Sequence, residues 1–153
     1  MNSIEAAARQ DAEKLPVLMS IWTEQNMQDG EPDQIELLTD GLMELRPHGV
    51  KLSYDETVLT GMEGTKTSLE INGPRVILQR SGMVSSRMVF EEGRQYTSLY
   101  DTPYGELSVD VQTSFLRHSL TEHGGEMEIR YSISIEHAST GQNHFLLKVK
   151  RKQ

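Results

Sequence analysis

Residues 107–115 read LSVDVQTSF and residues 127–135 read MEIRYSISI, and these two stretches decide the fold class. In both, apolar or aromatic side chains occupy nearly every second position, and polar side chains lie between them. Successive side chains of a β-strand point to opposite faces of the sheet, so a period of two predicts strands with one buried and one solvated face. A helix would scatter the same apolar side chains around its circumference.

The same alternation continues along most of the chain. The segments between the alternating runs are short and carry turn signals such as Asn72-Gly73, Glu92-Gly93 and Thr140-Gly141. Connections of this length leave no room for crossover helices, so neighbouring strands are expected to pair antiparallel. The sequence predicts ten strands, at about residues 17–25, 34–46, 49–57, 65–72, 75–81, 84–91, 94–101, 105–116, 125–137 and 143–150.

A meander of ten strands has to bury its apolar faces and protect its edges. Closure into a barrel achieves both, and the chain shows no long return connection of the Greek-key type. We therefore predict an all-β fold: a closed antiparallel up-and-down barrel of eight to ten strands, calycin-like or lipocalin-like in shape. Residues 1–153 are expected to form a single domain, with the barrel over 17–150 and a short helical or frayed segment over 1–16 that Pro16 ends.

Composition excludes several classes of partner. The chain has 15 Lys and Arg against 23 Asp and Glu, a formal net charge of −8, and a field of that sign repels nucleic acid and anionic lipid surfaces. It has no Cys, no signal-peptide-like apolar run at its start and no apolar run long enough to span a membrane, so we expect a cytoplasmic protein. Leu38 and Leu42 form an outward apolar strip, which the N-terminal segment or a second subunit could cover, so a homodimer stays open.

Two charged residues lie on faces that should be buried. Glu56 continues the apolar face of one strand and Arg80 continues that of another. An unpaired charge inside a barrel would cost several kcal/mol, so each needs a partner. We hypothesise that Glu56 and Arg80, with Tyr54 and Tyr131, form a polar cluster inside the barrel or at one mouth, where Arg80 could bind a ligand carboxylate. The alternatives are a structural ion pair near the strand ends, or side chains turned outward by a bulge.

Methionine is unusually frequent for a chain with so few large aromatic residues. There are eight Met against three Phe and one Trp, and Met88 and Phe90 share a strand face that could line a ligand site with the polar cluster. Flexible thioethers suit an adaptable cavity, but they also fill irregular cores. A pocket of about 300 Å³ or more with convergent polar groups would favour binding of a small apolar or carboxylate-bearing ligand. A filled interior would instead favour a structural or protein-interaction module.

Signatures of catalysis are missing from the sequence. It contains no Cys, no Gly-x-Ser-x-Gly elbow and no phosphate-binding or dinucleotide fingerprint, and its five His are dispersed without metal-ligand spacing. We therefore assign no catalytic residue, no metal site and no cofactor, and an enzyme is the least supported of the three function classes. The string Thr102-Pro103-Tyr104-Gly105 reads as a rigid corner between strands, with a binding loop as the alternative.

Several strings of the sequence share their order and spacing with one bacterial family. They are Leu52-Ser53-Tyr54-Asp55-Glu56-Thr57, Thr65, Thr67, Leu78-Gln79-Arg80-Ser81-Gly82, Met88-Val89-Phe90, Tyr100-Asp101-Thr102-Pro103-Tyr104-Gly105, Thr113 and Tyr131-Ser132. Through these strings the chain resembles the YwiB-like family of calycin-like β-barrel proteins, a domain of unknown function, over about residues 17–150. The resemblance implies a barrel related in shape to lipocalins and fatty-acid-binding proteins, but no activity. Ser20 stands where the lipocalin Gly-x-Trp motif has glycine before Trp22, so lipocalin-style transport is a fold analogy alone.

Overall fold

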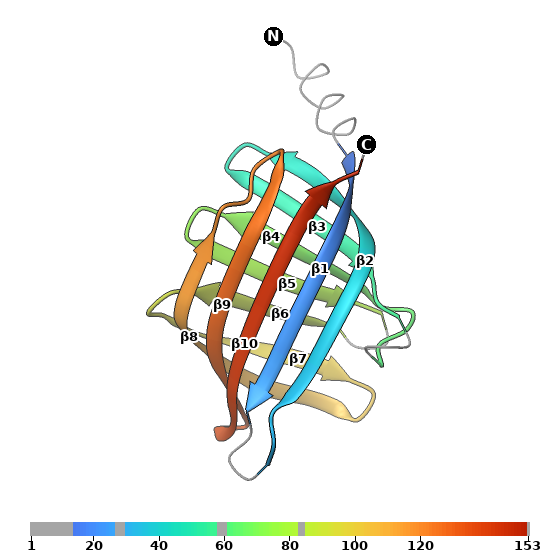
Figure 1. Cartoon of the computed structure of the whole chain (residues 1–153). Helices are drawn as coiled ribbons and strands as arrows, with labels where there is room; N and C mark the ends of the chain where they lie inside the picture. The colour runs from blue at the N-terminus through green and yellow to red at the C-terminus, as the bar shows by residue number, and fades with distance from the viewer. Residues whose placement is uncertain (1–13, 27–29, 58–60, 83–84, 153) are drawn as a thin grey trace, which may run out of the picture.

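The computed structural model describes residues 14–26, 30–57, 61–82 and 85–152, and its ten strands belong to one antiparallel sheet (Figure 1). Each strand pairs with its neighbours in sequence, apart from β6 and β7, and the first strand also pairs with the last. The predicted all-β meander is therefore confirmed. The strands are β1 Lys14–Asn26, β2 Asp33–Arg46, β3 Gly49–Asp55, β4 Lys66–Asn72, β5 Arg75–Ser81, β6 Ser86–Glu91, β7 Gln95–Thr102, β8 Gly105–His118, β9 Gly124–Ile135 and β10 Ala138–Arg151.

The barrel is nearly closed. β1 pairs with β10 over ten residues, which joins the two ends of the meander. The remaining seam, between β6 and β7, is bridged at Ser85 and Asp101, whose backbones exchange hydrogen bonds of 3.3 and 3.1 Å. The expected hairpin between these two strands is wrong over most of its length. Gly93 and Arg94 instead make backbone hydrogen bonds with Thr113, so the chain turns toward β8 directly after β6.

The inner faces of the strands form one hydrophobic core. Met19 and Met43 are fully buried and Met127 is 2 % exposed, so these methionines fill the interior as ordinary core residues. Gly41 makes room for one of them, because a Cβ atom at this position would lie 2.6 Å from the sulfur of Met19. The predicted alternation therefore produces a packed core over part of the barrel.

The first strand begins earlier than the sequence predicted. β1 starts at Lys14, so residues 14–16 belong to the barrel and not to an N-terminal helical segment; the rest of the predicted helix, up to residue 13, lies outside the described residues. Pro16 fits into the strand because its carbonyl accepts a hydrogen bond of 3.0 Å from Lys152 N, at the very end of the β1–β10 ladder. The N–H and C=O of one residue face the same neighbour in an antiparallel pair, so the missing N–H costs one terminal hydrogen bond.

A β-bulge moves one predicted core residue to the outside. The register of β8 against β9 shifts between Thr113 and Phe115. Phe115 consequently lies on the outer face, where the guanidinium groups of Arg117 and Arg130 lie 5.2 and 5.7 Å from its ring centroid. Leu116 takes the inward position and packs against the core. One inserted residue is enough to exchange the two faces of a strand.

The turn between β9 and β10 also differs from the prediction. The chain reverses at Glu136 and His137, which both have positive φ, and Gly141 lies instead at a bulge inside β10. Such turns usually select Gly, Asn or Asp. Here Ser108 of β8 holds the turn: its N–H donates to Glu136 Oε1 at 2.7 Å and its carbonyl accepts from Glu136 N at 2.9 Å. A tertiary contact thus replaces the local turn signal.

The outer surface agrees with two further expectations. Leu38 is 68 % exposed and Leu42 is 39 % exposed, so the apolar strip does face outward, and a homodimer through it stays a prediction. Thr102 and Gly105 pair across a two-residue turn, which Thr102 Oγ1 closes by donating to Gly105 O at 2.7 Å. This string is therefore a rigid corner.

No described segment forms a helix long and apolar enough to cross a membrane.

Packing inside the barrel can be tested with two leucines. Leu52 is fully buried in the core and Leu38 is exposed on the outer face. We expect Leu52→Ala to lower the free energy of unfolding by about 2–5 kcal/mol, because it leaves a cavity. We expect Leu38→Ala to change it by less than about 0.5 kcal/mol. Urea denaturation followed by circular dichroism measures both, and equal losses would contradict the inside–outside assignment.

Candidate ligand-binding cavity

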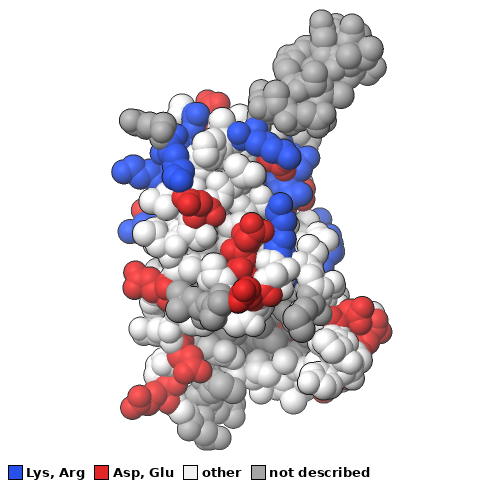
Figure 2. All heavy atoms as spheres, turned by 90° about the vertical axis from the view of Figure 1, so that its right-hand side faces the viewer, with Lys and Arg blue, Asp and Glu red and all other residues white. Residues whose placement is uncertain are grey.

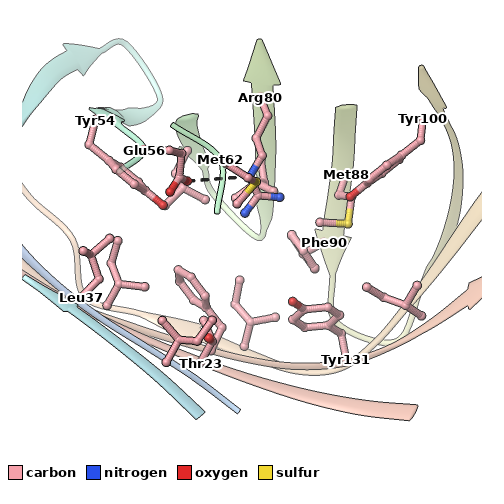
Figure 3. Close-up of a pocket in the computed structure, with 17 residues that line it drawn as sticks. Thr23, Leu37, Tyr54, Glu56, Met62, Arg80, Met88, Phe90, Tyr100 and Tyr131 are labelled. Carbon is pink, nitrogen blue, oxygen red and sulfur yellow. Dashed lines mark ion pairs between the residues drawn. The ribbon is translucent and has the colours of Figure 1, made fainter. Parts of the chain in front are cut away.

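One end of the barrel contains a cavity of about 250 Å³ (Figure 3). Every strand except β8 contributes to its wall, together with Glu56 and Met62 from the connection between β3 and β4. Eleven of the seventeen lining residues are aliphatic, Met or Phe, so the wall is mainly apolar. The seventeen are Ile21, Thr23, Ile35, Leu37, Tyr54, Glu56, Met62, Leu69, Leu78, Arg80, Met88, Phe90, Tyr100, Ile129, Tyr131, Ile133 and Phe145.

All six residues that the sequence proposed as a binding site line this cavity. They come from β3, the residue after it, β5, β6 and β9, and only the fold brings them together. Whether they bind a ligand is not tested by their position and stays a prediction. The six are Tyr54, Glu56, Arg80, Met88, Phe90 and Tyr131.

The centre of the polar cluster is the Glu56 carboxylate. Glu56 directly follows β3, where its backbone N–H donates to Thr65 O at 2.8 Å, and its side chain is 1 % exposed. Oε1 accepts a hydrogen bond of 2.6 Å from the hydroxyl of Thr67 and lies 3.8 Å from Arg80 Nε. Glu56 and Arg80 point toward one another from neighbouring walls of the cavity (Figure 3). The two charges on the inner face therefore compensate one another.

The cluster is not saturated with hydrogen bonds. Glu56 Oε2 and Arg80 Nε are buried, and neither has a hydrogen-bond partner among the described residues. The Arg80 side chain is 21 % exposed, so it extends from the buried carboxylate toward the open end. Buried polar atoms in proteins are nearly always hydrogen-bonded, to water or a ligand where protein groups are missing. The two atoms therefore represent spare capacity at the cavity wall.

Two tyrosines complete the polar side of the cavity as neutral groups. Burial raises the pKa of Tyr54 above its ordinary range, and the negative charge of the adjacent Glu56 carboxylate and its interaction with the Tyr54 hydroxyl raise it further. The hydroxyl lies beside the carboxylate (Figure 3), but Oε2 has no hydrogen bond of good geometry to it or to another described residue. Burial also raises the pKa of Tyr131 to about 12, and the edge of its ring packs against Phe90 with centroids 4.8 Å apart. The hydroxyls stay protonated near neutral pH. Apart from Glu56 and Arg80, no described lining residue carries a formal charge.

Sequence reasoning did not propose the other eleven lining residues or Thr67, and three of these show why. Thr67, the hydrogen-bond donor to Glu56, lies opposite Arg80 in the β4–β5 ladder and alternates with buried apolar residues, so its inward position was readable. Tyr100 shares one face of β7 with the polar Ser98, so the sequence shows no continuous apolar face on this strand. Met62 belongs to an irregular connection, and nothing in the sequence indicates that its side chain reaches the cavity.

The histidines contribute nothing to this cavity. His118 Nε2 lies 2.8 Å from Gly73 O, and His144 Nε2 lies 2.7 Å from a carboxylate oxygen of Glu128. Within the part of the chain that the structure describes, no three His, Asp or Glu side chains converge as metal ligands would. The chemistry available at the cavity is therefore that of the ion pair and the neutral hydroxyls.

The tyrosines give a testable pH dependence. Tyr54 and Tyr131 have raised folded-state pKa values, so both stabilise the fold fully below about pH 10, the value of an unfolded tyrosine. That contribution is lost as pH rises through the folded-state values. In an ultraviolet titration we expect Tyr54 and Tyr131 to ionise near or above pH 12, or on unfolding, and not near pH 10. Ionisation of all five near pH 10 in a protein still folded by circular dichroism would contradict this burial.

Comparison with known proteins places the chain in a family. Residues 19–147 match the family described as a domain of unknown function, DUF1934. The uncharacterized beta-barrel protein YwiB of Bacillus subtilis (strain 168) is 29 % identical over 116 residues, which cover 76 % of this chain and 78 % of the relative. The crystal structure of the ywiB protein from Bacillus subtilis matches with a TM-score of 0.79 at 22 % identity, over 92 % of this chain and 94 % of that one.

The structural match shows that the barrel fold is shared. The match to the family spans most of the chain and confirms the resemblance expected from the sequence. The chain belongs to the DUF1934 family of β-barrel proteins.

Proposed function

We propose that this protein binds a small molecule, mainly apolar with one polar end, in the cavity at the end of its barrel. The observation that carries the proposal is the unsaturated pair of buried polar atoms, Glu56 Oε2 and Arg80 Nε, in the wall of an otherwise apolar cavity. Ligand sites typically combine apolar walls with a few placed polar groups that fix orientation. The calycin-like role in ligand binding and the cytoplasmic location expected from the sequence are part of this proposal.

The size of the cavity limits the ligand. At about 30 Å³ for each water-sized group, 250 Å³ corresponds to about eight such groups. This volume is below about 300 Å³, the lower limit for drug-sized sites and the size above which we expected a cavity to favour ligand binding. The cavity therefore has room for a short-chain molecule but not for a long-chain fatty acid.

The rest of the interior leaves no room for a longer ligand. Met19, Met43, Leu52 and Val111 are fully buried, and none of them lines the cavity. This packed part of the barrel corresponds to the structural module considered as the alternative, and the cavity corresponds to the binding barrel. The two interpretations therefore differ at the cavity, and this is where function is to be tested.

Access to the cavity is available at its apolar rim. Ile35, near the start of β2, lines the cavity and is 44 % exposed. An apolar side chain at a rim costs free energy in water and is covered when an apolar ligand binds. Ile133 lies deeper, partly buried against the core, and faces the same space.

Binding can be tested with 1-hexanol, a neutral probe of suitable size. We expect saturable amide chemical-shift changes in a ¹H–¹⁵N NMR titration, centred on the residues that line the cavity. Ile133→Trp should weaken binding at least about tenfold because the larger side chain occupies the cavity, a change of about 1.4 kcal/mol.

The matched control is Leu38→Trp, which introduces the same side chain on the outer face and should leave the affinity unchanged. The proposal is wrong if the titration does not saturate, or if both tryptophan variants bind 1-hexanol as the original chain does.

A further inference from the structure

We propose that the cavity selects a ligand whose polar end is uncharged and places a hydrogen-bond donor beside an acceptor, as a primary carboxamide does. This inference rests on the proposed function and names the class of ligand. It differs from the carboxylate recognition that Arg80 suggests in the sequence, because the structure supplies that arginine with a carboxylate of its own.

The charges of Glu56 and Arg80 already balance one another. Arg80 Nε lies 3.8 Å from Glu56 Oε1, and the Glu56 side chain is 1 % exposed. A ligand carboxylate attracted to Arg80 would therefore bring a second negative charge next to the buried Glu56 carboxylate. Screening is weak there, and removing a charge from water is costly unless a free counter-charge receives it. A carboxylate thus gains little from an arginine that is already paired.

The unsatisfied atoms of this pair are an acceptor and a donor, and a ligand has to match both. Glu56 Oε2 is an acceptor without a donor, and a guanidinium group has N–H donors and no acceptor. A carboxamide matches both, because its N–H can donate to Glu56 and its carbonyl oxygen can accept from Arg80. A carboxylate offers acceptors alone and leaves Oε2 unsatisfied. An ammonium group offers donors alone and is repelled by Arg80.

The charge around the open end also matters, because five connections between consecutive strands lie there. Their described residues include the acidic Glu31, Glu63 and Glu136 but no Lys or Arg; these residues are 30–32, 56–57, 61–65, 82, 85, 103–104 and 136–137. On the face shown in Figure 2, Lys and Arg gather in the upper part, and Asp and Glu dominate the lower part, which is the end of the barrel where β1 ends in Figure 1. A field of this sign lowers the local concentration of anions. It acts against a free carboxylate before the ligand reaches the cavity.

The neutral tyrosines act in the same direction. Tyr54 and Tyr131 keep their protons near neutral pH and add dipoles to the cavity wall without adding charge. No further cation among the described lining residues is available to compensate an anionic ligand. An uncharged polar end is therefore the one that the wall accommodates without an unpaired charge.

The test compares three probes with six carbon atoms each: hexanamide, hexanoate and hexylammonium, titrated at pH 7 into the full chain and followed by NMR. We expect hexanamide to bind at least about tenfold more tightly than either charged probe, a difference of about 1.4 kcal/mol. Hexanoate binding as tightly as hexanamide overturns the inference about the polar end and leaves the proposed function standing. If neither these probes nor 1-hexanol bind, the proposed function fails and the inference fails with it.

Substitution of the charged pair adds a stronger criterion, a reversal of preference. Glu56→Gln keeps the size of the side chain and leaves Arg80 uncompensated, so hexanoate should then bind more tightly than hexanamide. Arg80→Gln should shift the preference toward hexylammonium. Because it leaves the nearly buried Glu56 carboxylate without its counter-charge, we expect it to be the more destabilising of the two variants.

The control is Glu91→Gln, which removes the carboxylate of another ion pair, 3.3 Å from Arg75 Nε and outside the cavity wall. It should leave the order of the three probes unchanged. An unchanged order in a folded Glu56→Gln or Arg80→Gln protein would contradict selection by charge balance.

Discussion

The backbone pairing of β1 with β10 is the constraint on which the rest of the structure depends. It runs from Val17 opposite Arg151 to Asn26 opposite Gln142 and connects strands from the two ends of the chain. Without it the inner faces of ten strands would belong to an open sheet, with apolar side chains in water and long unpaired edges. Among the described residues, the opposite seam between β6 and β7 is bridged only at Ser85 and Asp101, and this one bridge could not hold the barrel together. Long-range pairing thus creates the enclosed interior that makes a binding site possible.

Inside that interior, the Glu56–Arg80 pair has an unusual position. A buried ion pair often stabilises a fold no better than apolar side chains of the same volume, because both charges lose their hydration. Here the carboxylate is almost completely buried, while the arginine keeps part of its surface in contact with solvent. The hydroxyl of Thr67 supplies one hydrogen bond and leaves Glu56 Oε2 without one. The proposed ligand would supply the hydrogen bond that the described residues leave unmade at this oxygen.

Much of the fold could be read from the sequence, because side-chain alternation is a local property of a strand. The ten strands, the inward position of Glu56 and Arg80 and the outward position of Leu38 all follow from that period. The exceptions arise where another part of the molecule decides. The bulge that turns Phe115 outward depends on the register with β9, and the turn at Glu136 depends on hydrogen bonds to Ser108.

The cavity itself could not be read from the sequence. Its volume depends on how side chains from nine strands and one connection pack together, and no single strand contains that information. Two methionines illustrate this. Met43 and Met88 both occupy inward positions of their strands, yet Met43 fills the core and Met88 lines the cavity. Met62 reaches the same space from a connection without any period.

The central claim is that the unsatisfied Glu56–Arg80 pair orients a small ligand in the cavity. The most direct measurement is a crystal structure of the chain grown with hexanamide. The account predicts density inside the barrel, with the amide nitrogen within hydrogen-bond distance of Glu56 Oε2, the carbonyl oxygen facing Arg80 and the hydrocarbon against Ile133 and Phe90. A cavity that has closed around its own side chains, or an amide bound on the outer surface, would contradict it.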